Sequence, residues 1–559
     1  MVDNQIKIEM GDWMINAGIV GLYNILENAG DDVQFYEQGI QIEHSMLNNF
    51  EEKYFNYFIE KYKESTAWFK IVSYKEIIKN YENNDFKNFN DQSLESLNKY
   101  IEMVKDYLNR NNYKKVYPFI KHDKNILGLH KELSKIKLSK KDKIEDKIDD
   151  VKDRFKIINE IIDYCGSEDG KKYIAAKGVI YSVINNAWNG ICFLNPQTKE
   201  HDVYIDYRNY FIEPVLKYIG SEKSKFKYSC FSCDRAIKDL KNDLSFLTMT
   251  GFDVSRKSSH VWNFDNDVAV CPICKLIYSC IPAGITYVYD KGIYINDNSN
   301  IENAIHINNK IKAEILKESE IKNSRTYRAL VNAIYEQFND KVKYELSDIQ
   351  IVKYEDNKYK FNILSKKSLK IISESQKNLN GLIKCGFKEV NTYFNIYELI
   401  IDRLLNNQNL FTLIHKLLIY KLSTPKDSHF SISQVLKILN INQIFLEGMG
   451  YMENQEKDII KIANASGYYL RKKYKEKRAQ DKLSGIAYRL LNALKTNNEG
   501  MFMDTILNCY LYANTTVPNV FIDALRNNEN LKTIGYAFVS GLIEGKEQND
   551  KNGGDNNEK

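Results

Sequence analysis

Four of the nine cysteines in this 559-residue chain form two Cys-x-x-Cys pairs, which are Cys230 with Cys233 and Cys271 with Cys274. A Cys-x-x-Cys turn directs two sulfur atoms at one point, and two such turns supply the four thiolates of a tetrahedral Zn²⁺ site. The 37 residues between the pairs are more than zinc ribbons usually contain, so we expect a small lobe there. A closed site of four thiolates leaves no coordination position for a substrate. The pattern therefore predicts structural zinc.

Other interpretations of the cysteines remain open. The two pairs could be separate redox or core thiols, and the same four ligands would also accept iron. Cys280 lies close behind the second pair and could be a core thiol or a substitute ligand. His260 stands alone between the pairs, so no histidine has the spacing of a ligand.

The composition indicates a protein with reduced thiols. The N-terminus has no basic segment followed by an apolar one, and no apolar run approaches the roughly 20 residues of a membrane span. Nine cysteines without a secretory signal favour thiols and metal over disulfides. We therefore expect a cytoplasmic protein that makes no membrane contact.

Charge is distributed unevenly along the chain. Residues 1–60 contain eleven acidic and two basic side chains, a local charge of −9, so the remainder must carry +14 to give the net charge of +5. This asymmetry favours one end that faces a polyanion and another that docks on protein. A chance excess of charge on solvated faces is an equally good interpretation.

The hydrophobic patterning predicts an α+β fold that is mostly helical. Short strands are expected where β-branched and aromatic residues cluster, at 180–184, 191–194 and 203–205, and hairpins at 285–296 and 349–363. Residues 483–494 carry an apolar stripe with helical spacing. We divide the chain into a mixed α/β domain (1–220), a four-cysteine zinc lobe (221–284), a small sheet with helices (285–400), an antiparallel helical bundle (401–546) and a disordered tail (547–559).

The first predicted helix has Asp12 as its N-cap and carries Gly18 and Gly21 on one face. Because glycine has no side chain, another backbone could approach this face closely. The segment lacks the preceding strand and the Gly-x-Gly-x-x-Gly spacing of a phosphate-binding loop. We therefore expect a tightly packed first helix.

The strongest basic run lies in the predicted bundle. Six cationic side chains fall within eight residues, offset only by Glu476, and tyrosines at 468, 469 and 474 are interleaved with them. Such a run suits a phosphate backbone, and tyrosines stack on unpaired bases, although a merely solvated helix is the alternative. The predicted nucleic-acid-binding residues are Arg471, Lys472, Lys473, Lys475, Lys477, Arg478, Lys482 and Arg489.

A second candidate surface is the turn around Asn185, Asn186 and Trp188. Amide side chains read base edges and an aromatic ring stacks on bases, so these residues are candidates for reading a short DNA motif. A hairpin loop with a buried tryptophan explains the same residues.

Motifs of known enzymes are missing from the sequence. It contains no Gly-x-x-x-x-Gly-Lys-[Ser/Thr], no His-Glu-x-x-His and no Gly-x-Ser-x-Gly, and its eight histidines are scattered. We therefore expect a binding subunit and not an enzyme.

Several blocks of the sequence resemble the large subunit (the Cas-eight type, cysteine-bearing branch) of type I-B CRISPR Cascade surveillance complexes. They occur in the same order from end to end of the chain, and their order carries most of the weight. The blocks are Gly11-Asp12-Trp13 with Asn16 to Gly21, the pair Cys230-x-x-Cys233, Cys271-Pro-Ile-Cys274 with Ile277-Tyr278 and Pro282 to Gly284, and Gly535 to Leu542.

The resemblance implies a non-catalytic subunit of a ribonucleoprotein that finds DNA by guide-RNA pairing. It implies that the protein binds double-stranded target DNA, reads the flanking motif (the PAM) and stabilises the R-loop in antiviral defence. The implied partners are the crRNA, the other Cascade subunits and a recruited helicase-nuclease. The C-terminal bundle resembles the separate small subunits that lie along the displaced strand.

Glu447-Gly448 shortly precedes Met449 and Met452, and codons for Glu-Gly can form a ribosome-binding sequence. Related systems make a small subunit by internal initiation, so we predict a second product that starts near Met449 or Met452. The alternative is that these methionines lie in an interhelical loop.

Two other classes of function remain open. One is a zinc-containing RNA-processing or RNA-modifying enzyme, which would need a catalytic constellation that the sequence does not display. The other is a protein-interaction scaffold whose basic helix is incidental.

Overall fold

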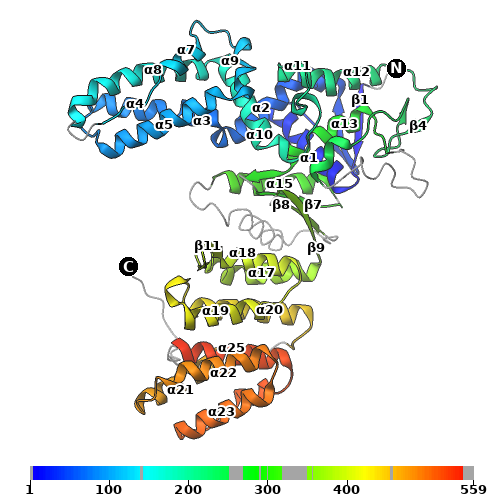
Figure 1. Ribbon diagram of the computed structural model, residues 1–559. Coiled ribbons are helices and arrows are strands. Elements are labelled where there is room, and N and C mark those ends of the chain that lie inside the picture. The colour runs from blue at the N-terminus through cyan, green and yellow to red at the C-terminus, as the bar shows by residue number, and fades with distance from the viewer. Residues whose placement is uncertain are drawn as a thin grey trace. The chain divides into compact units, whose positions relative to one another are not determined.

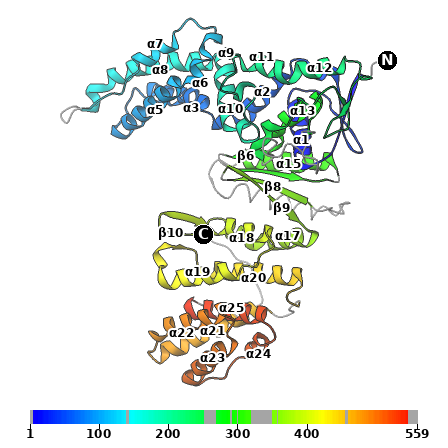
Figure 2. The same ribbon diagram turned by 45° about the vertical axis from the view of Figure 1, so that its right-hand side comes forward.

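The computed structural model describes residues 4–138, 143–250, 268–288, 291–298, 300–317, 349–355, 357–453 and 458–544. The chain divides into two compact units, Met1–Asn308 with Ile351–Phe361, and Asn309–Gln350 with Asn362–Lys559. Helices dominate and the sheets are small and antiparallel, which confirms the predicted fold class (Figures 1 and 2). Among the described helices, none combines the length and the apolar character that crossing a lipid bilayer requires. His260 and the predicted tail at 547–559 lie outside the described residues.

The first unit begins with a three-stranded sheet of order β1-β3-β2, formed by β1 (Gln5–Glu9), β2 (Gln34–Tyr36) and β3 (Gly39–Glu43). Antiparallel pairing places Ile6 opposite Ile42 and Ile8 opposite Ile40, so the buried residues share one face. Strand β1 directly precedes the first helix, which corrects the expectation that no strand would do so.

Helix α1 (Trp13–Asn28) starts as predicted, because the Asp12 carboxylate accepts hydrogen bonds from the backbone N–H of Met14 and Ile15. The remaining helices of the first half are α2 (Phe50–Tyr62), α3 (Ala67–Val72), α4 (Tyr74–Asn83), α5 (Asp91–Asn109), α6 (Asn111–Lys114), α7 (Ile126–Glu132), α8 (Ile148–Gly166), α9 (Glu168–Gly170), α10 (Ala176–Ser182), α11 (Val203–Tyr207) and α12 (Glu213–Ile219). Helices α4, α5 and α8 lie in one group in Figure 1, where α4 packs against α8.

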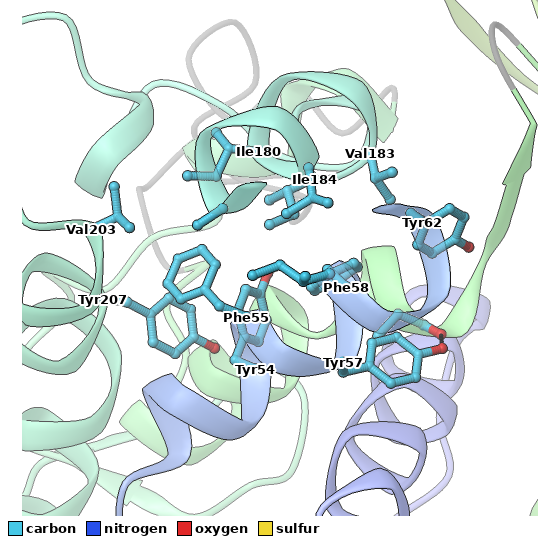
Figure 3. Close-up of a cluster of buried hydrophobic side chains, with 14 of the residues drawn as sticks. Tyr54, Phe55, Tyr57, Phe58, Tyr62, Ile180, Val183, Ile184, Val203 and Tyr207 are labelled. Carbon is cyan, nitrogen blue, oxygen red and sulfur yellow. Dashed lines mark hydrogen bonds between the residues drawn. The ribbon is translucent and has the colours of Figure 1, made fainter. Parts of the chain in front are cut away.

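The strands predicted between 180 and 205 are wrong. That stretch forms α10, short 3-10 turns at 184–186 and 192–194, and α11. A π-helical turn at 171–175 precedes α10, and another at 208–212 follows α11. The β-branched and aromatic residues there pack against Tyr54, Phe55 and Phe58 on α2 (Figure 3). This packing replaces the cross-strand contacts that give such residues their preference for strands.

A four-stranded sheet of order β6-β7-β8-β9, most of which belongs to the first unit, confirms both predicted hairpins. Its strands are β6 (Thr286–Val288), β7 (Lys291–Asn296), β8 (Ile349–Glu355) and β9 (Lys358–Leu364). Helix α15 (Ile301–Lys317) follows β7, and the Asn308 side chain on it binds both the N–H and the C=O of Ile295, at 2.9 and 2.7 Å.

The second unit is mainly helical and contains the predicted C-terminal helices. Its helices are α17 (Lys366–Asn380), α18 (Ile396–Leu405), α19 (Phe411–Ser423), α20 (Ile432–Met449), α21 (Ile459–Glu476), α22 (Lys482–Lys495), α23 (Glu499–Ala513), α24 (Val520–Ala524) and α25 (Asn528–Glu544). A small sheet of order β11-β10-β12 joins β10 (Gly386–Glu389), β11 (Thr392–Asn395) and β12 (Ser428–His429). The predicted stripe on α22 is buried at Leu483, Ala487, Leu490, Leu491 and Leu494.

Close backbone contacts hold pairs of helices together in both units. In the first unit, a Cβ atom added at Gly21 would overlap the carbonyl oxygen of Cys280, and one added at Gly284 would overlap that of Ala17. In the second, Gly467 on α21 and Gly541 on α25 face each other's helix in the same way. The close approach predicted for the Gly18–Gly21 face is confirmed, and the approaching backbone is the segment 277–284.

We expect Gly21→Ala to lower the free energy of unfolding of the first unit by about 1–3 kcal/mol, because the added methyl group overlaps backbone that cannot rotate away. Gly485→Ala is the matched control, since Gly485 lies within α22 and nothing is within 4 Å of an added Cβ. Thermal unfolding followed by circular dichroism would show a lower midpoint for Gly21→Ala alone. An equal midpoint for both variants contradicts the packing described.

Candidate metal centre

The first cysteine pair sits in a tight hairpin. Strands β4 (Tyr228–Ser229) and β5 (Ala236–Ile237) pair antiparallel, and the Cys230 N–H donates to the Arg235 carbonyl at 2.8 Å. The Asp234 N–H donates to the Cys230 carbonyl at 2.9 Å, and Asp234 adopts a left-handed conformation with φ of 58°. This turn brings Cys230 and Cys233 to the same side of the hairpin, as a metal-binding knuckle requires.

The second pair lies at the start of α13 (Pro272–Ser279). Cys271 is the N-cap residue, and its sulfur accepts a hydrogen bond from the Cys274 N–H at 3.4 Å. Pro272 occupies the first helical turn, where its missing N–H costs no hydrogen bond. The helix start therefore orients both sulfurs toward the hairpin, and α14 (Ile281–Gly284) follows directly.

All four sulfurs meet at one place, within 4.8 Å of one another. The Sγ atoms of Cys233 and Cys271 are 3.7 Å apart, and the Cys271 N–H donates to the Cys230 sulfur at 3.1 Å. Only Cys233 is more than slightly exposed. The number, type and spacing of these ligands fit a four-coordinate metal ion, so the four predicted ligand residues form a candidate metal site.

Cys280 does not join this cluster. It is fully buried, and its thiol donates to the Leu276 carbonyl at 3.4 Å. Burial raises its pKa to about 12, so the thiol stays protonated. Of the two interpretations of Cys280, the structure favours a core thiol.

The surroundings of the cluster favour negative charge on two of its four sulfurs, because the pKa values of Cys230 and Cys233 are lowered and those of Cys271 and Cys274 are raised. Hydrogen bonds from Cys233, Cys271 and Cys274 hold the pKa of Cys230 well below its ordinary value. The Arg235 guanidinium donates to the Cys233 sulfur at 3.4 Å and also binds the Lys7 carbonyl on β1. Sequence reasoning missed Arg235, although a cation two residues after a Cys-x-x-Cys pair would have drawn attention to it.

Side chains from distant parts of the first unit hold the segment that follows the second pair. Three tyrosine hydroxyls on α2 donate hydrogen bonds to carbonyls of this segment. Tyr54 donates to Ser279 at 2.9 Å, Tyr57 to Ala283 at 3.1 Å and Tyr62 to Ile285 at 3.4 Å. Trp188 Nε1 also donates to the Ser279 carbonyl, at 3.1 Å, and Asn24 Nδ2 to the Ala283 carbonyl, also at 3.1 Å. The metal centre therefore opens a helix whose far end is fixed in the core.

The predicted basic residues lie together at the end of α21 and along α22, in the second unit. All of them are exposed except Arg471, which is half-buried. Lys473 pairs with Glu476 at 2.8 Å, and the ammonium groups of Lys477 and Lys482 stand 5.2 and 4.9 Å from the Tyr512 ring centroid. The run is thus a solvent-facing cationic surface, as both a nucleic-acid interface and a solvated helix would be.

The tyrosines near the basic run have different positions. Tyr474 is buried against Tyr512 and cannot stack on a base, whereas Tyr469 is 43% exposed. Tyr488 and Tyr512, which sequence reasoning did not single out, are 38% and 41% exposed. Tyr512 lies near the cations only because α23 packs beside the basic run, so no local pattern in the sequence indicates it, whereas Tyr488 directly precedes Arg489 and could have been singled out.

The stacking role predicted for Trp188 conflicts with its burial. Its ring is fully buried among Phe193, Phe211 and Phe246, as the alternative interpretation expected. Asn186 accepts hydrogen bonds from Tyr354 and Tyr359 on the four-stranded sheet. Asn185 is half-buried, and a role in reading DNA remains a prediction for both asparagines.

Residues 223–286 match the family described as CRISPR-associated protein (Cas_CXXC_CXXC). The match indicates a CRISPR-associated protein with paired Cys-x-x-Cys motifs. It includes both cysteine pairs, α13 and α14, and it supports a role in CRISPR defence. Neither a curated protein nor a solved structure matches the chain.

We expect Cys230→Ser and Cys271→Ser to lose the bound ion, from roughly one per chain to near none, because three thiolates and a hydroxyl bind it far more weakly. Cys280→Ala is the control and should keep the ion, since Cys280 lies outside the cluster. Elemental analysis of the purified proteins by plasma mass spectrometry measures this directly. Full metal content in both serine variants would show that the ligand set is wrong.

Proposed function

We propose that the chain is the non-catalytic large subunit of a crRNA-guided type I-B Cascade complex, which binds target DNA and stabilises the R-loop. The observation that carries the proposal is the match of the cysteine lobe to a CRISPR-associated family. In this proposal guide RNA reads the target sequence, while the protein reads a short flanking motif and holds the backbone. Binding of the crRNA, of further Cascade subunits and of a helicase-nuclease is part of the same proposal.

We infer that the ion held by the four cysteines is Zn²⁺. Four thiolates in a closed arrangement are typical of structural zinc, and the knuckle and helix N-terminus repeat the geometry of such sites. The ion has no open position in this arrangement, so its contribution is to the stability of the lobe. The elemental analysis of the wild-type chain distinguishes zinc from iron.

Co-purification tests the proposal as a whole. When the chain is expressed with its neighbouring genes and pulled down, we expect a uniform short RNA of repeat and spacer, together with partner proteins. Mixed RNA, or none, would contradict membership of a guide complex. Turnover of RNA by the isolated chain would favour a processing enzyme, and partner binding without nucleic acid would favour a scaffold.

The basic surface supports contact with DNA in the second unit. Lys472, Lys473, Lys475, Lys477 and Arg478 are exposed on consecutive turns, and Tyr469 and Tyr512 are partly exposed. Cations of this kind bind phosphates and release counterions, and exposed rings stack on unpaired bases. We infer that this surface holds the displaced strand.

We expect the combined substitution of Arg471, Lys473, Lys475 and Arg478 by Ala to weaken DNA binding for all sequences alike. The slope of log K against log salt should fall by about 3–4, because each phosphate contact contributes about one. The control replaces four other lysines of the same unit by Ala and so removes the same charge. These exposed residues are Lys367, Lys370, Lys377 and Lys426. Fluorescence anisotropy over a salt series measures both. Equal slopes in the two variants would contradict the assignment.

A helix ends at the predicted internal start, as the alternative of an interhelical loop also expects. Helix α20 ends at Met449, where Gly450 caps it with φ of +81°, and Met452 is buried just beyond. A product that starts at either methionine contains α21 to α25 whole. Within it, α21 and α25 make the close contact at Gly467 and Gly541, so the product keeps a core of its own.

We expect intact-mass analysis of the purified complex to show a second species that begins at Met449 or Met452. Synonymous recoding of the Glu447 and Gly448 codons should remove it and leave the full-length chain, since only the ribosome-binding sequence changes. A short species that survives recoding would be a proteolytic fragment and would contradict internal initiation. The absence of any short species would contradict it as well.

A further inference from the structure

The hairpin of β4 and β5, which carries the first cysteine pair, is fixed to the first unit by hydrogen bonds of its backbone. The Tyr218 hydroxyl on α12 donates to the Ala236 carbonyl at 2.8 Å, and the Phe231 N–H donates to the Ala269 carbonyl at 2.9 Å. Both ends of the hairpin are therefore held in place. Side chains that it exposes to solvent are preorganised for a ligand, because little freedom is lost when the ligand binds.

Two aromatic side chains of this hairpin are exposed to solvent. Tyr228 in β4 is 46% exposed, and Phe231, which lies between Cys230 and Cys233, is 48% exposed. Neither ring belongs to the cysteine cluster, so neither has a role in holding the ion. Exposed apolar groups that gather in one short element mark interaction sites, whereas scattered ones do not. Flat rings of this kind are the side chains on which unpaired bases stack.

Two lysines lie beside Tyr228 at the open end of the hairpin. Tyr228 pairs with Ile237 across the two strands, Lys227 directly precedes Tyr228, and Lys238 directly follows Ile237. This register places both lysines next to the same pair of residues. Both side chains are exposed, and neither makes an ion pair or a side-chain hydrogen bond within the part of the chain that the structure describes. Their ammonium groups are therefore available to an anion.

The charge of the surrounding segment also favours an anionic ligand. Residues 223–238 contain five cationic side chains and one acidic one, a charge of +4 before the cysteines are counted. Four thiolates with a divalent ion would contribute −2, so +2 remains. Lys223 belongs to this surface by contact, because its ammonium group stands 4.8 Å from the centroid of the Tyr218 ring, whose hydroxyl binds β5. Exposed rings among lysines match the bases and phosphates of a single strand.

We propose that the β4–β5 hairpin binds single-stranded RNA, with Tyr228 and Phe231 stacking on unpaired bases and the two lysines at its open end contacting phosphates. Zinc knuckles are a recurring module for single-stranded RNA, and aromatic stacking is the way in which such modules hold bases. That this RNA is the crRNA rests on the proposed function. The hairpin lies in the first unit, whereas the basic surface of α21 and α22 lies in the second.

Photo-cross-linking tests the site in the unaltered full chain. The probe is a short RNA without secondary structure in which thiouridine replaces uridine, and mass spectrometry of the digested protein identifies the attached residues. We expect cross-links on Tyr228 or Phe231, because a stacked base lies against the ring. Cross-links confined to other segments of the chain overturn the inference.

Affinity measurements test the same residues by substitution, in the background of the fourfold Ala variant of the α21 surface. We expect Tyr228→Ala and Phe231→Ala each to weaken binding of the RNA by on the order of tenfold, because each loses the stacking of one base. Lys227→Ala and Lys238→Ala should each lower the slope of log K against log salt by about 0.7, the value for one phosphate contact in a single strand. Tyr393→Ala is the matched control and should bind RNA unchanged, since Tyr393 is 48% exposed in the hairpin of β10 and β11.

Elemental analysis accompanies every variant. Because the substituted side chains lie outside the cysteine cluster, we expect each variant to keep its ion, which shows that the lobe is folded. If a variant loses the ion, the cross-links on the unaltered hairpin decide the result. Unchanged affinity in variants that keep the ion overturns the inference, and tighter binding of DNA of the same sequence overturns its assignment to RNA. Both outcomes leave the proposed function standing, which fails instead if the complex purifies without crRNA.

Discussion

The first unit depends on pairing the carbonyl groups of one buried segment, Cys271–Ile285. This segment consists of two short helices, and helix ends leave carbonyls without partners inside the helix. Three tyrosine hydroxyls from α2, the Trp188 indole and the Asn24 amide supply those partners. A buried carbonyl that loses its partner costs about 1–3 kcal/mol, so these contacts fix the segment in one position.

The same segment links the metal centre to the rest of the unit. Its first residue, Cys271, belongs to the cysteine cluster, and its end leads into β6. Its middle packs on α1 through backbone contacts. These contacts are possible because residues 18, 21 and 284 are glycines. The N-terminal sequence block and the second cysteine block are therefore parts of one packing unit, although about 250 residues of chain separate them. This explains in physical terms why the two blocks occur together in the sequence.

Features that depend on local chemistry could be predicted from the sequence. The Asp12 cap, the glycine face of α1, the four cysteine ligands, the two hairpins and the apolar stripe of α22 each follow from residue type at short spacing. The helices between 176 and 207 could not be predicted, because Ile180, Val183 and Ile184 prefer strands and they pack against a core that includes α2, which is far away in the chain. Likewise, Trp188 finds its hydrogen-bond partner 91 residues away at Ser279. Arg235 reaches β1 by the same kind of long-range contact.

We expect a metal ion held by the four cysteines to stabilise the fold through α13 and α14. Hydrogen exchange followed by mass spectrometry, before and after removal of the ion with a chelator, tests it most directly. Loss of the ion should expose amides in α13, α14 and the facing side of α1, while α21 to α25 keep their protection because they belong to the other unit. Unchanged protection of α13 and α14 after complete removal of the metal would contradict the account.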